Sequence, residues 1–183
     1  LNFKSEIHNQ YFNTVNKRVN NKDVSGDYYR ILPLTGIYLE TPFLHTGTST
    51  NFNPKIGLIL SPESTIYNSI SNEDSTNNKY SISNQGQLNR FSGTDNLDDS
   101  NRIMYSVDIN KEKINLNFVQ NYEFNPDSNY NKQIGNSNYL NDALLSLSYN
   151  EELTKFNYTS RYDPNNKDFI KHLVSIENDN KLT

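Results

Sequence analysis

The chain has 183 residues, a length that suits one domain of ordinary size. Its net charge of -4 gives no basic surface for nucleic acid, and the lack of cysteine excludes disulfides and thiolate chemistry. Mean hydropathy is low, at -0.84, but 13 Tyr and 9 Phe argue against disorder. No apolar stretch approaches the roughly 18 residues of a membrane helix, whereas the half-polar strands of a membrane barrel need only about 9–11.

Apolar and polar residues alternate with a period of two along most of the chain, and no comparable stretch has the 3.6-residue period of a helix. In one clear run, Ile103, Tyr105 and Val107 alternate with polar neighbours. The pattern predicts an all-β protein with little helix. Its strands, about eight in number by these template matches, are expected near residues 1–12, 28–43, 52–60, 102–110, 113–124, 142–150, 153–162 and 168–177.

The predicted connections alternate in length. Long ones are expected at residues 14–27, 61–101 and 125–141, and short ones at 44–50, 111–112 and 151–152. An antiparallel up-and-down meander with short turns at one end and long loops at the other is what an outer-membrane barrel requires. Alternation alone also suits a soluble sandwich, whose apolar faces pack inward instead of facing lipid. Aromatic residues at strand ends suit the interfacial girdles of a barrel, but Tyr is also common in strands of any kind, so they leave both architectures open: Tyr122, Phe124, Tyr149 and Tyr162.

The connection at residues 61–101 contains the run Asn89-Arg90-Phe91-Ser92-Gly93-Thr94-Asp95. Gly93 permits a positive φ, and the side chains of Asn89 and Asp95 can bond nearby backbone amides. Arg90 can pair with Asp95, with Asp98 or with a carboxylate of the lumen, and Phe91 can anchor the loop against an apolar surface. Such a loop is expected to fold onto another part of the protein.

Other patterns give no catalytic signature. The histidines lie far apart without metal-ligand spacing, no Ser sits in G-x-S-x-G, and no Gly-rich phosphate loop is present. We therefore expect no enzymatic activity, no cofactor and no metal. Carboxylates in the 61–101 connection offer ligands for Ca²⁺, but they lack the order of a calcium loop, and a solvated acidic loop is the favoured interpretation. These carboxylates are Glu73, Asp74, Asp95, Asp98 and Asp99.

The run at residues 89–95 resembles a motif of the LptD (OstA) family, the outer-membrane proteins that insert lipopolysaccharide into the outer leaflet. Asn96 stands where that family usually has Arg after the motif's Asp. The similarity covers residues 28–125. Further matching pieces follow in the same order: Arg30-Ile31-Leu32-Pro33, Gly36, Pro42-Phe43, Pro54, Asn72-Glu73-Asp74-Ser75 and Asp99-Ser100-Asn101-Arg102.

The resemblance implies that residues 1–183 are an internal piece of a transmembrane β-barrel domain, a sector of a large barrel in the cell outer membrane. The long loops near residues 61–101 and 125–141 are then extracellular, and the first is expected to fold into or across the lumen. The implied partners are lipopolysaccharide, an LptE-like lipoprotein plug, a periplasmic LptA-like bridge and the lipids of the outer membrane.

The alternatives to this assignment are another outer-membrane barrel, such as a porin or receptor, and a soluble carbohydrate-binding β-sandwich. Under the barrel interpretation, polar strand residues line a wet lumen, and basic ones attract phosphorylated sugars. The candidate lumen-facing or substrate-contacting residues are Arg30, Lys55, Arg102, Ser106, Asp108, Asn115, Asn117 and Arg161.

Overall fold

The computed structural model describes residues 1–19, 22–64, 66, 69–70, 72, 74–77, 80–134 and 138–178. Its main strands are β1 (Asn2–Val19), β2 (Lys22–Glu40), β3 (Phe43–His45), β4 (Thr50–Leu60), β7 (Arg102–Lys111), β8 (Ile114–Glu123), β9 (Ala143–Asn150), β10 (Thr154–Asp163) and β11 (Asp168–Asn178). The connection at residues 61–101, here called loop 61–101, holds the short strands β5 (Thr76–Asn77) and β6 (Phe91–Ser92) and helix α1 (Ile82–Gln85). Helix α2 (Asn129–Ile134) lies in the connection at residues 125–141.

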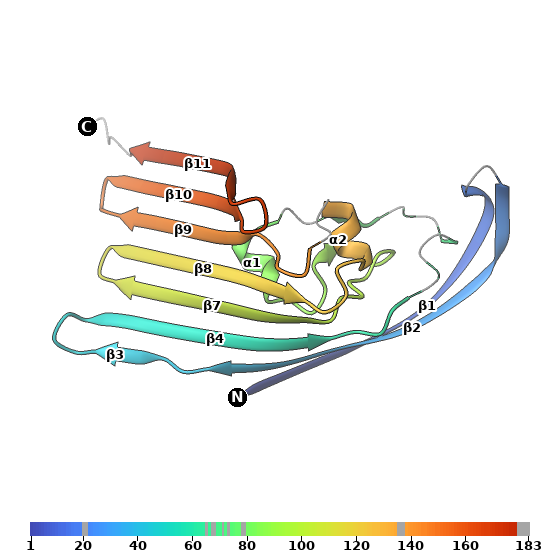
Figure 1. Ribbon diagram of the computed structural model, residues 1–183, viewed down its shortest axis with the longest axis horizontal. Coiled ribbons are helices and arrows are strands. Elements are labelled where there is room, and N and C mark those ends of the chain that lie inside the picture. Colours follow the sequence, from blue (N-terminus) through green and yellow to red (C-terminus); the bar gives the residue numbers. More distant parts are fainter. Residues whose placement is uncertain are drawn as a thin grey trace.

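The long strands form one antiparallel sheet in the order β1-β2-β4-β7-β8-β9-β10-β11, and the short strand β3 pairs with β4 (Figure 1). Long strands that are consecutive in the chain are neighbours in the sheet, so the predicted up-and-down meander is confirmed. The sheet is open, with β1 and β11 at its two edges. It therefore has the form of a barrel sector. No helix among the described residues is long and apolar enough to cross a membrane.

The short β3–β4, β7–β8 and β9–β10 turns lie at one end of the sheet (Figure 1). Loop 61–101 and the 125–141 connection lie at the other end, together with the short β10–β11 turn. The prediction of a long connection at residues 14–27 is wrong. β1 and β2 stay paired as far as Val19 and Lys22, with a register shift between Thr14 and Lys17. Polar side chains suggested a loop there, but the ladder joins backbone groups and does not need apolar side chains.

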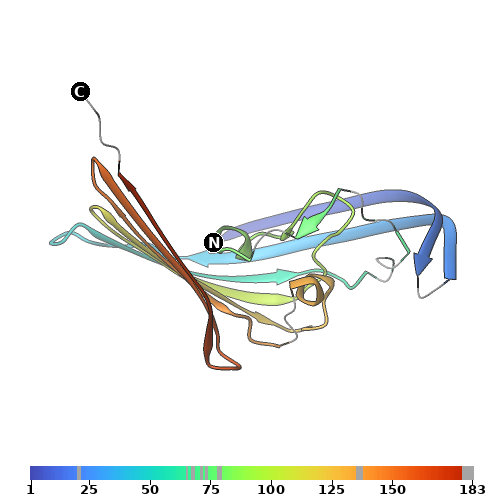
Figure 2. The same cartoon turned by 90° about the horizontal axis from the view of Figure 1, so that it is seen from above.

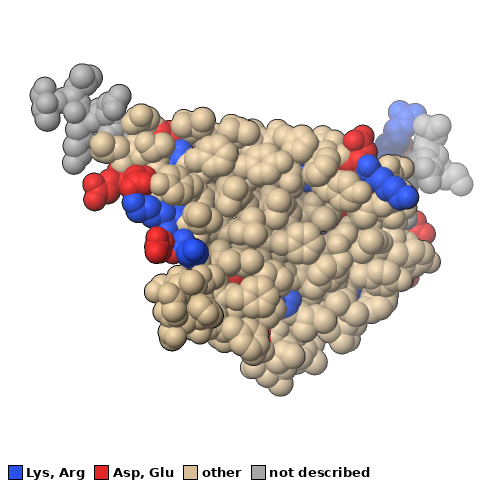
Figure 3. Space-filling view, turned by 60° about the vertical axis from the view of Figure 1, so that its left-hand side comes forward, with Lys and Arg blue, Asp and Glu red and all other residues tan. Residues whose placement is uncertain are grey.

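The pairing register gives the sheet two different faces. On the outer face Leu58 lies opposite both Ile37 and Ile103. Figure 3 shows a broad area of uncharged side chains between two charged margins. A continuous exposed apolar surface of this kind is typical of the lipid-facing side of a barrel and is not expected of a soluble sandwich. Exposed apolar residues of this face include Phe3, Ile7, Ile31, Ile37, Leu39, Phe52, Ile56, Leu58 and Ile114.

The inner face is covered in part by loop 61–101, which lies along one side of the sheet (Figure 2). This face is less uniformly polar than the sequence indicated, because several of its residues form the hydrophobic core together with Leu88 and Leu97 of the loop. The core residues that the strands contribute are Leu32, Leu34, Tyr38, Ile59, Met104, Val119 and Leu144. Burial of these side chains at the sheet fixes the position of the loop.

Candidate functional site

A tight turn in loop 61–101 is built around the carboxylate of Asp74. This carboxylate accepts hydrogen bonds from Thr94 N at 2.9 Å, from Thr94 Oγ1 at 2.8 Å and from Asp95 N at 3.0 Å. These donors, first of all the Thr94 amide, hold the pKa of the Asp74 carboxyl well below its usual range. In return, Asp95 Oδ2 accepts from Asp74 N at 3.0 Å. The turn therefore joins two segments of the loop that lie 20 residues apart.

Gly93 occupies the place in this turn that no other residue fits. Its φ of 84° lies in the left-handed region, as the motif predicted. A Cβ at this position would come within 2.5 Å of the carbonyl oxygen of Asp74. The backbone conformation and the close approach both require glycine.

We therefore expect Gly93→Val to open the Asp74 turn, at a cost of about 2–3 kcal/mol from backbone strain and the clash. Amide hydrogen exchange of residues 91–96 should become faster by one to two orders of magnitude, while exchange in β7 and β8 stays unchanged. Gly47→Val is a suitable control, because Gly47 lies in an exposed turn and is not among the residues with positive φ. Unchanged exchange at residues 91–96 would contradict the role given to Gly93.

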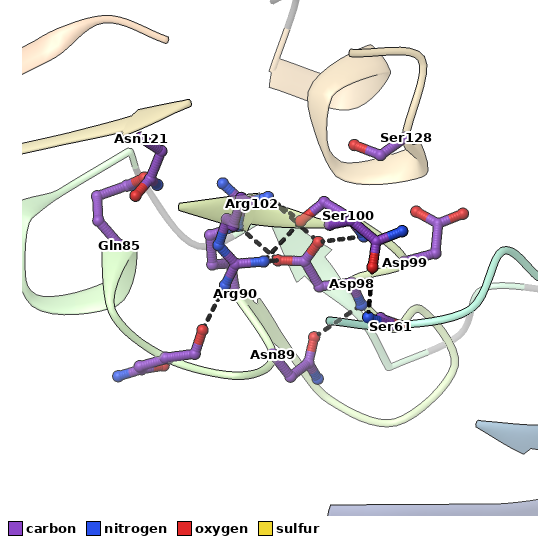
Figure 4. A network of polar contacts seen from close by, with 12 residues as sticks. Ser61, Gln85, Asn89, Arg90, Asp98, Asp99, Ser100, Arg102, Asn121 and Ser128 are labelled. Carbon is purple, nitrogen blue, oxygen red and sulfur yellow. Dashed lines mark hydrogen bonds and ion pairs between the residues drawn. The ribbon is translucent and has the colours of Figure 1, made fainter. Parts of the chain in front are cut away.

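Arg90 is the centre of a buried polar network (Figure 4). Its Nε and Nη2 donate to the two oxygens of Asp98 at 2.5 and 3.2 Å, and its Nη1 donates to Oε1 of Glu123 on β8 at 2.8 Å. Arg102 on β7 also donates to Asp98, at 3.1 Å. Ser100 Oγ accepts from both arginines, at 2.7 and 2.6 Å. Two arginines and two carboxylates thus neutralise one another across the boundary between loop and sheet.

Opposite charges in this network stabilise the ionised forms of Arg90 and Asp98 despite their burial. Burial by itself would raise the pKa of Asp98, but the guanidinium groups of Arg102 and Arg90 outweigh it and hold this pKa at about 2. Burial likewise lowers the pKa of Arg90, and the carboxylates of Asp98 and Glu123 more than reverse that effect. Arg90 and Asp98 therefore hold each other in the charged state, and the network forms an ionic clamp between the loop and the sheet.

Helix α2 closes the network from the other long connection. The Arg90 guanidinium lies 3.9 Å from the ring centroid of Tyr130, a cation–π contact, and the ring of Phe91 meets the same tyrosine edge-on at 5.3 Å. Phe91 and Tyr130 are both buried. The predicted anchoring role of Phe91 is thus met by an aromatic partner on α2.

Side chains of the sheet also hold the loop backbone. Arg30 donates to the carbonyl oxygens of Asp95 at 2.6 Å and Thr94 at 2.7 Å, and Tyr38 Oη donates to the carbonyl oxygen of Gly86 at 2.9 Å. The Asn121 amide donates to Oε1 of Gln85 at 2.6 Å, and Arg102 donates to the carbonyl oxygen of Gln87. The loop is therefore attached to β2, β7 and β8 through points within its residues 85–95.

All eight candidate lumen residues lie on the face that the loop covers, as the pairing register shows. Their tasks differ. Arg30 and Arg102 hold the loop, and Arg161 donates to Asp142 at 2.5 Å.

Two hollows remain on this face beside α1. Lys55, Ser106 and Asp108 line one of about 340 Å³, and Asn117 and Arg161 line another of about 770 Å³. Asn115 donates to Asn110 and accepts from Asn117.

The acidic loop residues are not a solvated cluster. Asp98 and Asp99 are buried, and Asp74 is engaged by loop amides. Glu73 lies outside the described residues. Within the part of the chain that the structure describes, no group of three or more acidic or histidine side chains could hold a metal ion. The carboxylates serve as hydrogen-bond acceptors that organise the loop.

Two residues of the site had no role in the sequence interpretation. Glu123 faces Arg102 directly across the β7–β8 hairpin. Pairing the two predicted strands around a two-residue turn at 112–113 would have placed them opposite each other. Tyr130 had no comparable signal, because no periodic pattern surrounds it.

Asp99 joins the two long connections. Its Oδ1 accepts from the backbone N–H of Asn129 at the start of α2, at 2.8 Å. Burial raises the pKa of the Asp99 carboxyl to about 6. The bond from Asn129 by itself favours the carboxylate, but burial outweighs it, so protonation of Asp99 stabilises the packed state in which this side chain is buried. The contribution is lost as the pH rises through 6 and is fully present below the ordinary pKa of 3.8.

We expect the attachment of α2 to become more stable by roughly 1–1.5 kcal/mol between pH 7.5 and pH 5. Hydrogen exchange at residues 126–132, corrected for the intrinsic pH dependence, measures this change. Asp99→Asn should remove the pH dependence, and Asp127→Asn, a nearby substitution of an exposed side chain, should leave it intact. Equal pH dependence in Asp99→Asn and the parent protein would assign the effect to another group.

An open antiparallel meander with an apolar outer face, and with a long loop clamped onto its inner face, defines a sector of an outer-membrane type of β-barrel. The sequence matches the model of the LptD family, described as LPS transport system D, over residues 1–182, and the chain belongs to that family. The match extends well beyond the residues 28–125 that carried the resemblance. No curated protein matches the chain.

Proposed function

We propose that this chain forms part of the wall and the inward-folded loop of an LptD-type translocon, which inserts lipopolysaccharide into the outer leaflet of the outer membrane. The observation that carries the proposal is the difference between the two faces of one sheet. The outer face is a continuous apolar surface, and the inner face combines polar side chains and hollows with the clamped loop. Membership of the LptD family supports the same function.

The task of such a translocon is physical. A large amphiphile has to move its sugars through a polar interior while its acyl chains enter the membrane, and the alternating strands supply both environments. No bond in the substrate has to be made or broken, so the protein needs no catalytic group. The end of the sheet with the long connections then faces the cell exterior, and the end with the short turns faces the periplasm.

The partners follow from the family and not from features of this chain. They are lipopolysaccharide itself, an LptE-like lipoprotein inside the barrel, a periplasmic LptA-like bridge that delivers the substrate, and the lipids around the outer face. Loop 61–101 narrows the interior at the outward end. Its ionic clamp keeps the loop against the wall, so that the space beside it stays open to the substrate.

Replacing residues 89–95 by a Gly/Ser linker of equal length, in the full-length protein in cells, tests this proposal. We expect raised sensitivity to large hydrophobic antibiotics and less lipopolysaccharide at the surface, with barrel insertion retained. A Gly/Ser replacement of the exposed turn at residues 46–49 is the control. Wild-type permeability and surface lipopolysaccharide in the 89–95 variant would reduce the motif to a surface turn and overturn the role of the loop.

A further inference from the structure

The larger hollow of the inner face, about 770 Å³, lies between the α1 segment of loop 61–101 and strands β9, β10 and β11. Its lining combines hydroxyl and amide groups with apolar side chains, among them Ile82, Leu144 and Leu173. The polar uncharged groups include Ser83, Asn117, Ser146 and Thr159. Hydroxyls and amides beside small apolar surfaces are the chemistry that contacts a sugar ring, with its hydroxyl groups and its apolar C–H faces.

Two cations meet in this hollow. Arg161 on β10 and Lys171 on β11 are direct partners in the antiparallel register, and both line the hollow. Like charges directly opposite each other destabilise a sheet. The same ladder contains a second like-charged pair, Asp163 opposite Asp168, and one complementary pair, Lys155 opposite Glu177. Of the two like-charged pairs, Arg161–Lys171 is the one that lines the hollow, and it places two cations side by side there.

The register itself brings Lys171 to this face. Asp163 pairs with Asp168 and Tyr162 with Phe169, but Arg161 then pairs with Lys171, so that Ile170 is the extra residue of a bulge. Without the bulge Arg161 would lie opposite Ile170, and Lys171 would point to the outer, apolar face. Bulges commonly re-aim a side chain next to a functional site.

The two cations differ in what already neutralises them. Arg161 donates to Asp142 at 2.5 Å, and its guanidinium lies 4.5 Å from the ring centroid of Tyr80. Lys171 is exposed and makes no ion pair within the described part of the chain. The hollow thus keeps one positive charge that no acidic side chain offsets.

The smaller hollow is a contrast. It contains the cations Lys4 and Lys55, but Asp108 also lines it, and Lys55 lies opposite Glu40 in the β2–β4 register. Its lysines also lie near the ring of Tyr38, at 5.5 and 5.0 Å from the centroid. Charge in this second hollow is therefore compensated from within the sheet, and the excess charge is specific to the larger one.

We propose that the larger hollow binds an anionic saccharide, with Lys171 as the direct ligand of the anionic group and Arg161 as a fixed second cation beside it. The inference rests on the proposed function, because the saccharide would be the headgroup of the transported glycolipid. It adds a residue that the sequence interpretation did not select. Among the candidate arginines, Arg30 and Arg102 are engaged in holding the loop, so recognition falls to a lysine that a bulge turns inward.

The test uses the full-length protein in detergent with a phosphorylated glucosamine disaccharide as the probe. Acetylation of individual lysines is followed by mass spectrometry. We expect the probe to protect Lys171 and to leave Lys155 as reactive as before. The unphosphorylated disaccharide and inorganic phosphate, each at the same concentration, should protect Lys171 far less. In a binding titration, Lys171→Gln should weaken the probe about tenfold, and Lys155→Gln should have no effect.

Equal acetylation of Lys171 with and without the probe would overturn the proposal. Protection by inorganic phosphate alone would show a simple anion site and would also overturn it. A separate measurement, the complementation of lipopolysaccharide export by the full-length gene, reports on the proposed function. Normal export together with an unprotected Lys171 would reject the saccharide site alone. Failure of the unaltered full-length gene to restore export would reject the proposed function itself.

Discussion

Arg90→Ala is expected to release loop 61–101 from the sheet. The substitution removes the ion pair of the buried Glu123 carboxylate with Arg90 and leaves Asp98 with Arg102 alone, and breaking a buried pair in this way costs about 3–5 kcal/mol. It also removes the stacking on Tyr130. Limited proteolysis of the full-length protein in detergent should then cut within residues 61–101, where the parent protein resists. Arg18→Ala, at an exposed position of β1, should leave the resistance unchanged.

A second pair of variants separates the charge from the packing. Arg90→Met removes the cation but keeps much of the side-chain volume, so it should cost nearly as much as Arg90→Ala. Adding Glu123→Gln to Arg90→Met removes the carboxylate that lost its partner, while Asp98 keeps its ion pair with Arg102. We expect this double variant to regain part of the resistance to proteolysis. Full resistance in Arg90→Met alone would show that packing, and not the ionic clamp, holds the loop.

Val107→Arg is the second substitution with a large expected effect. Val107 lies opposite Pro54 and Phe118 on the outer face, and an arginine near the middle of the lipid-facing surface costs about 2–4 kcal/mol. Ser106→Arg places the same side chain in the smaller inner hollow, opposite Lys55, and should cost much less. The fraction of folded barrel in outer-membrane extracts, read from heat-dependent mobility on gels, compares the two variants.

Thiol labelling in cells provides an independent reading of the same faces. Residues 1–183 contain no cysteine, so a single Cys at position 106 or 107 is the one thiol that this segment contributes. A water-soluble thiol reagent should modify position 106 and leave position 107 unmodified. Strong labelling at 107 and none at 106 would reverse the assignment of inner and outer faces.

The faces of the strands could be predicted because side chains of a strand alternate strictly between two sides. Ser106 and Val107 were assigned to opposite faces from that period alone, and all eight candidate residues do share the inner face. The extension of β1 and β2 through residues 14–27 was missed because backbone hydrogen bonds can form in a polar segment that has no alternation of apolar and polar residues. The Gly93 turn was anticipated because glycine adopts a positive φ without steric cost.

Contacts between distant segments could not be read in the same way. Arg90 meets Glu123 across 33 residues of chain, and Tyr130 comes from the next long connection. No local period describes such contacts, since they depend on where a long loop comes to rest. The position of Lys171 depends on one extra residue, Ile170, in the pairing of β10 with β11. A shift of one residue exchanges the two faces of a strand, so folding of the whole sheet, and not the alternation within one strand, places this lysine beside Arg161.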